Sequence, residues 1–238
     1  MIELARARDI TALFRESLAV YVRHAGVFVA LSAAVVVPVF LIVQGIGLEQ
    51  LSADYDSSPS VAEAAVPTVV SFLVVTPIVT AICIHALRSV AAGEQIGAGR
   101  AFVSGFEAFT PLFFAVALAA IGIAVGFLAL IVPGIYLAVR WFFVPQAVVI
   151  DRGRGPAALT RSGDVVHGFW WRTFGLVVLV NLAVALPAVV LTAPFAAIAE
   201  STDRAIWSLA GSIVAESVTA PFAALFSTLL YYDLRARR

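Results

Sequence analysis

Six apolar runs, each close to the length of a membrane-spanning helix, alternate with short polar segments along this chain. A helix needs about 20 mostly apolar residues to cross the roughly 30 Å hydrocarbon core of a bilayer. Hydrophobic residues make up 62% of the chain and charged residues only 13%, far from the composition of a soluble domain. We therefore predict a single all-α integral membrane domain over residues 1–238. Its six transmembrane helices are expected at about 26–47, 65–90, 112–132, 135–150, 173–198 and 205–232.

The third and fourth runs form one apolar block that is interrupted by Pro133 and Gly134. Proline cannot continue the hydrogen-bond ladder of a helix, and glycine allows the chain to reverse direction. We therefore expect a tight hairpin at this pair. On the third run, Gly122 and Gly126 are four residues apart, a pattern that favours close helix packing.

Arginine supplies all 15 basic residues, because the chain contains no lysine. With six spans, all but two of these arginines fall on one side of the membrane. The exceptions are Arg140, inside an apolar run, and Arg204, in a short loop. Loops rich in arginine stay in the cytoplasm, so both termini are expected there. This composition, rich in Ala, Val and Arg, suggests a multi-pass protein of a prokaryotic inner (plasma) membrane.

Three short cytoplasmic segments show the spacing of amphipathic helices that lie along a membrane surface. They cover residues 10–21, 102–109 and 156–166, and each precedes a pair of spans. This layout is consistent with three parallel repeats of an interfacial helix and a hairpin. The helices either simply join spans or present a docking surface for a partner. Their arginines can also hold anionic lipid headgroups, and we expect such contacts from Arg15, Arg23, Arg161 and Arg172.

Two charged residues lie well inside the apolar runs, Arg140 in the fourth and Glu216 in the sixth. A charge at the bilayer centre costs roughly 2.5 to 3.5 kcal/mol, so such residues normally face the bundle interior and pair. We hypothesise an ion pair between them, either structural or part of a substrate- or proton-linked site. Ser212 and Thr219 share a polar stripe with Glu216, and Asn181 is a further polar candidate that we expect to be buried.

Several kinds of chemistry find no support in the sequence. The formal net charge of zero provides no field that would attract nucleic acid. The three histidines are far apart in sequence, and no cysteine or carboxylate pattern completes a ligand set. Motifs for nucleophilic or phosphate-binding sites are also absent. We therefore expect no metal, no cofactor and no catalytic residue.

Two stretches resemble a known family. One is Ile131-Val132-Pro133-Gly134-Ile135-Tyr136 with Arg140 and, downstream, Gly168-Phe169-Trp170-Trp171-Arg172; the other is Leu229-Leu230-Tyr231-Tyr232-Asp233-Leu234-Arg235. They resemble the membrane domain of some glycerophosphodiester phosphodiesterases and related stand-alone, uncharacterised six-span bacterial membrane proteins. In that family the catalytic part is a separate soluble barrel, for which this chain has no room. The resemblance therefore implies the membrane fold without phosphodiesterase activity.

These observations lead to two functional expectations. The first is a non-enzymatic membrane protein that serves as a scaffold or accessory subunit, with membrane lipids and a protein partner or second copy as its partners. The alternative is a small transporter or lipid-handling protein that uses an interior site at Arg140 and Glu216. A water-accessible cavity that reaches Glu216 would favour the alternative.

Overall fold

The structure is a computed structural model that describes residues 6–45 and 68–238. This part of the chain is built from helices and contains no strand. Six of its segments are long and apolar enough to cross a membrane, which confirms the predicted fold class. These candidate spans are Ala25–Val43, Thr68–Ala91, Phe109–Ala129, Ile131–Asp151, Trp170–Thr202 and Ala205–Ala236.

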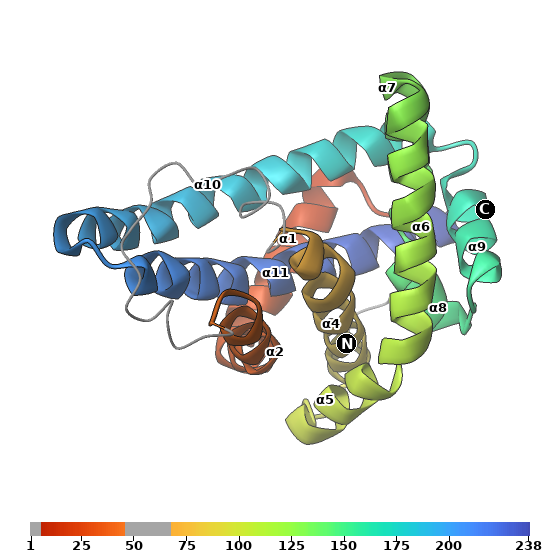
Figure 1. Ribbon diagram of the computed structural model, residues 1–238. Coiled ribbons are helices and arrows are strands. Elements are labelled where there is room, and N and C mark those ends of the chain that lie inside the picture. Colours follow the sequence, from red (N-terminus) through yellow and green to blue (C-terminus); the bar gives the residue numbers. More distant parts are fainter. Residues whose placement is uncertain (1–5, 46–67) are drawn as a thin grey trace.

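The order of one short helix followed by two long segments occurs three times along the chain (Figure 1). The short helices α1, α5 and α9 lie where the sequence predicted amphipathic helices. The elements are α1 (Ile10–Arg23), α2 (Ala25–Gly45), the π-helical turn η2 (Ser71–Val75), α4 (Thr76–Ala91), α5 (Ala98–Glu107), α6 (Phe109–Ala129), α7 (Ile131–Arg140), α8 (Val144–Asp151), α9 (Pro156–Val166), α10 (Trp170–Thr202) and α11 (Ala205–Ala236).

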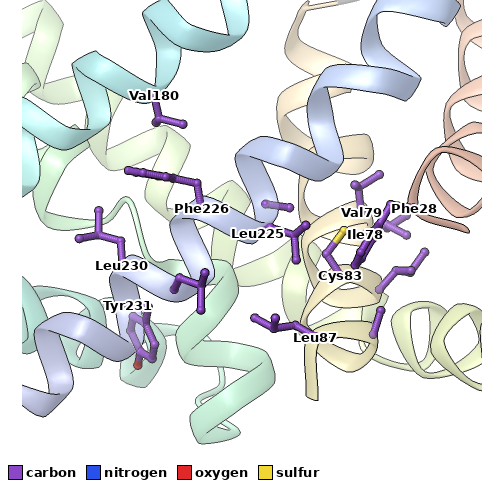
Figure 2. Close-up of a cluster of buried hydrophobic side chains, with 14 of the residues drawn as sticks. Phe28, Ile78, Val79, Cys83, Leu87, Val180, Leu225, Phe226, Leu230 and Tyr231 are labelled. Carbon is purple, nitrogen blue, oxygen red and sulfur yellow. The ribbon is translucent and has the colours of Figure 1, made fainter. Parts of the chain in front are cut away.

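The core of the protein surrounds α11, which packs against α10, α2, α4 and α1. Figure 2 shows Leu225 of α11 facing Val79 and Cys83 of α4, and all three side chains are buried. On another side of α11, Phe226 packs against Phe14 of α1 in a tilted arrangement with ring centroids 4.5 Å apart. This apolar contact anchors the amphipathic helix α1 to the bundle.

A hydrogen bond also joins α1 to α11. The Tyr21 hydroxyl donates to the main-chain carbonyl of Val218 at 2.7 Å. Burial raises the pKa of Tyr21, so its hydroxyl keeps the proton that it donates here.

The hairpin between α6 and α7 is present, but the chain reverses at Leu130, which is extended (φ −164°, ψ 152°). The predicted turn at Pro133 and Gly134 is therefore wrong by three residues. Proline is tolerated in the first turn of a helix because the N–H groups there have no intrahelical acceptor. Gly134 instead allows close packing, because a Cβ on Gly126 would lie 3.1 Å from the Gly134 Cα.

The fourth apolar segment is divided by a turn at residues 141–143, between α7 and α8. The buried Ser162 of α9 bridges this turn. Its hydroxyl donates to the carbonyl of Arg140 at 2.9 Å and accepts from the N–H of Phe143 at 3.2 Å. The expected continuous helix over 135–150 is thus two helices, and Ser162 of α9 bonds one backbone acceptor and one backbone donor at the break.

The helices α10 and α11 pack along each other as a long hairpin, which Figure 1 shows in cyan and blue. Their 33 and 32 residues correspond to about 50 Å each at 1.5 Å per residue. The outer face of α10 exposes Leu186, Val189 and Val190. Such a continuous apolar face suits contact with lipid chains and would be unusual on a soluble monomer. Together with the six apolar helices, this face indicates a membrane protein.

Candidate functional site

The two charges predicted to form an ion pair have different partners. Arg140 ends α7, and its guanidinium donates to the Tyr136 hydroxyl at 3.0 Å. The same side chain lies against α9, since a Cβ on Gly163 would be 2.7 Å from Arg140 Nε. Glu216 of α11 accepts a hydrogen bond from the Ser71 hydroxyl at 2.9 Å. Within the described residues, the hypothesised pair of Arg140 and Glu216 is not formed.

The helix break after α7 explains this correction. If the fourth span were one continuous helix, Arg140 would lie in its middle, at a depth where a partner such as Glu216 is needed. Because α7 ends at Arg140, the side chain reaches the surface helix α9 instead. The sequence pattern revealed the charge but not the break.

The other polar candidates within the spans bond to their own helices. Ser212 donates to the carbonyl of Ser208 at 3.0 Å, and Thr219 donates to that of Ala215 at 2.7 Å. Asn181 donates to the carbonyl of Val177 at 2.7 Å and lies on the exposed side of α10, so the expected burial of Asn181 is wrong. Bonds of this kind satisfy hydroxyls and amides without a partner helix.

A buried carboxylate, Asp233 near the end of α11, joins three parts of the chain. It is fully buried and accepts hydrogen bonds from the backbone N–H of Arg8, from Arg172 at 3.2 Å and from Arg237 at 3.0 Å. Arg172 and Arg237 also donate to the carbonyl of Arg8, at 2.9 and 2.6 Å. Asp233 therefore fastens the segment before α1 to the adjoining ends of α10 and α11.

A second carboxylate, Asp151, connects α8 with α11. It accepts a hydrogen bond from Tyr231 at 2.5 Å and forms an ion pair with Arg235 at 2.6 Å. The backbone carbonyl of Asp151 accepts from Arg161 of α9. Arg88 of α4 reaches the same region, where its Nε donates to the Tyr232 hydroxyl at 3.4 Å.

We call this region the basic end of the protein. It consists of the two carboxylates and the arginines that surround them: Arg8, Arg88, Arg161, Arg172, Arg235, Arg237, Asp151 and Asp233. It contains arginines from four segments that the sequence assigned to one side of the membrane. Charge-assisted hydrogen bonds are roughly twice as strong as neutral ones, so this network fixes how the helix ends meet.

Of the four arginines predicted to hold lipid headgroups, two are used inside the protein. Arg172 donates to Asp233 and to the Arg8 carbonyl, and its expected role as a headgroup contact stays a prediction. Arg161 is exposed but donates to the backbone of α8. Arg15 and Arg23 are exposed and make no side-chain bond within the described residues, so they stay candidates for lipid contact.

Sequence reasoning missed Asp151, Asp233 and Arg8 as determinants of the fold. One signal was present, since Asp233 and Arg237 are four residues apart on one helix and have opposite charges. Asp233 also lies in the family-like stretch that ends the sixth apolar run. Nothing in the sequence, however, indicated that a residue 225 positions earlier would meet this carboxylate.

A cleft of about 440 Å³ opens beside the basic end, between the C-terminal halves of α1 and α4. Its lining residues are Glu16, Ala19, Val20, Arg23, His24, Val90, Gly93 and Glu94. Glu216 is not among them, so this cleft provides no path to the polar stripe of α11. Within the described ranges, no three His, Cys, Asp or Glu residues are grouped in a way that could hold a metal ion.

Comparison with known proteins places the chain without revealing an activity. No curated protein and no solved structure matches it. The model of one family, described as a domain of unknown function, DUF7847, matches residues 78–234, from α4 to near the end of α11. The likeness to phosphodiesterase membrane domains stays a prediction. Because the match covers more than half of the 238 residues and includes both carboxylates of the basic end, the chain belongs to the DUF7847 family.

Proposed function

We propose that this protein is a non-enzymatic scaffold or accessory subunit of a prokaryotic inner membrane, with its basic end in the cytoplasm. The observation that carries the proposal is that polar side chains of the spans and of the basic end bond to partners within the protein. Glu216, Ser212 and Thr219 within the spans bond to their own or a neighbouring helix, and the buried ions of the basic end fix helix ends to one another. This arrangement supports a rigid framework.

The orientation follows from the arginines. Segments rich in arginine remain in the cytoplasm when a multi-pass protein is inserted. The basic end gathers arginines from the segment before α1, from the end of α4, from the segment that carries α9 and the start of α10, and from the end of α11. Placing this end in the cytoplasm satisfies the rule for all four segments at once.

The transport alternative depends on an interior site made jointly by Arg140 and Glu216. Arg140 packs against α9 and Glu216 bonds to Ser71, so these two residues do not support a shared binding site. The scaffold role is therefore the better-supported proposal.

The surface best suited to a protein partner lies on the amphipathic helices. On α1, Leu18 is 51% exposed and Val22 is 63% exposed, and on α5, Phe106 is 47% exposed. These apolar side chains lie on the short helices that border the spans. A docking partner would cover them, whereas the apolar side chains of α10 would stay in contact with lipid.

Site-specific photocrosslinking in the native membrane tests the proposal. A photoreactive amino acid is placed at Val22 of α1, and a matched control is placed at Val190 of α10, which is 71% exposed. We expect a discrete protein adduct from position 22 and only lipid adducts from position 190. If both positions yield lipid adducts alone, the scaffold role through α1 is rejected.

A further inference from the structure

The cleft between α1 and α4 combines one wall of positive charge with one of negative charge. We propose that it binds a phosphate ester that carries an ammonium group, the chemistry of a phosphoethanolamine headgroup. This inference does not depend on the scaffold role, because it concerns a small ligand and a different set of residues. The volume of the cleft, about 440 Å³, lies in the range typical of small-molecule sites, roughly 300 to 1,000 Å³.

The cationic wall is formed by the end of α1. Arg23 lies in the last turn of this helix, and His24 follows it directly. Neither side chain makes a hydrogen bond or ion pair with any described residue, so their donors are available to a ligand. The planar guanidinium of arginine matches the geometry of phosphate oxygens and binds them through two parallel hydrogen bonds.

The anionic wall is formed just beyond the end of α4. Gly93 has a positive φ of 76° and turns the chain, so that Glu94 lines the cleft. Glu94 is exposed and has no side-chain partner among the residues that the structure describes. It is a free carboxylate facing the same space as the free Arg23, and no ion pair joins the two.

Glu16, the other carboxylate of the cleft, is already neutralised. Its two oxygens bind Arg6 at 2.8 Å and Arg8 at 2.7 Å. The uncompensated charges of the cleft are therefore one cation, Arg23, and one anion, Glu94. A ligand with a single type of charge would leave one of them unpaired, whereas a zwitterion satisfies both. This balance distinguishes the site from a general anionic-lipid surface.

Apolar residues form the rest of the lining. Ala19 and Val20 of α1 and Val90 of α4 offer short, mostly aliphatic surface between the charged walls. Such a lining fits the two-carbon bridge between the phosphate and the amine. Because α1 is amphipathic and adjoins the first span, the cleft opens at the level where lipid headgroups lie.

The test measures lipid binding by native mass spectrometry on the full-length protein in detergent. The probes are phosphatidylethanolamine, phosphatidylglycerol and, as a soluble source of the same group, O-phosphoethanolamine. The variants are Arg23→Gln and Glu94→Gln, with Arg204→Gln and Asp164→Asn as exposed controls outside the cleft. Each variant is first checked for wild-type retention on size-exclusion chromatography.

We expect Arg23→Gln to weaken binding of both lipids about tenfold, the loss of one charge-assisted contact to phosphate. Glu94→Gln should weaken the binding of phosphatidylethanolamine about fivefold or more. It should leave the binding of phosphatidylglycerol unchanged, because only phosphatidylethanolamine carries an amine. Both controls should bind as wild type. Saturable binding of O-phosphoethanolamine that Glu94→Gln also weakens would support the site and assign it to a soluble source. Equal effects of Glu94→Gln on the two lipids, or no effect of either cleft variant, would overturn the proposal.

Discussion

Replacing Asp233 with alanine should destabilise the protein by about 3 kcal/mol. The carboxylate is fully buried, and its removal leaves the buried backbone N–H of Arg8 without this acceptor, at a cost of about 1 to 3 kcal/mol. Arg172 and Arg237 lose their counter-charge, but their side chains are 24% and 28% exposed. Water therefore partly replaces the lost carboxylate, and each of the two broken ion pairs adds at most about 1 kcal/mol to the destabilisation. The sum lies at the low end of the cost of breaking a buried ion pair.

The measurement is equilibrium unfolding in mixed micelles, followed by the fluorescence of the tryptophans at the start of α10. Asp233→Asn should lose less, about 1 to 2 kcal/mol, because the amide keeps an acceptor for the Arg8 N–H while the charge is lost. Asp164→Ala serves as the control, since Asp164 is exposed on α9 and its side chain has no bonded partner in the described part of the chain. Its effect should stay within about 0.5 kcal/mol. If Asp233→Ala and Asp164→Ala agree within that margin, Asp233 does not organise the basic end.

Three further changes test other parts of the packing by the same unfolding measurement. Gln146 donates to the Ser227 hydroxyl at 2.9 Å, while its own carbonyl oxygen has no partner among the described residues. Gln146→Leu should therefore be neutral or stabilising, but Ser227→Ala should cost about 1 to 2 kcal/mol. Gly134→Val should cost about 1 to 3 kcal/mol because a Cβ there meets a ring of α6 at 2.4 Å. The control Gly175→Val, on the open face of α10, should cost far less. Equal effects of the two substitutions would argue against close packing of the hairpin. Tyr21→Phe should cost about 1 kcal/mol through the lost bond to α11, and no loss would mean that water replaces the hydroxyl.

The sequence predicted the features that depend on hydrophobic patterning. Apolar length and composition are properties of single segments, so the six long helices and the short helices before each pair were accessible from the chain alone. The glycine spacing on α6 also pointed correctly to close packing, since Gly126 meets α7. These signals are local and need no knowledge of which helices touch.

What could not be predicted depends on tertiary contacts. The break at residues 141–143 is stabilised by Ser162, which lies in a different helix, and only this break turns Arg140 away from Glu216. Likewise, the sequence assigned Arg172 to lipid because an arginine before a span usually lies at the interface. Its counter-ion, Asp233, is 61 residues away, and no spacing rule connects them. Charge alone therefore predicted where arginines lie but not which of them are already occupied.

The junction at Asp233 has a consequence for how the protein is made. Arg8 is synthesised first, and the carboxylate that binds its backbone follows 225 residues later. At about 5 to 20 residues per second, this delay is roughly 10 to 45 seconds. Throughout that interval the segment before α1 lacks its acceptor and must remain hydrated while five spans are inserted. Closure of the junction therefore reports that α11 has arrived, so a quality-control protease that recognises a loose N-terminal segment would distinguish finished molecules from incomplete ones.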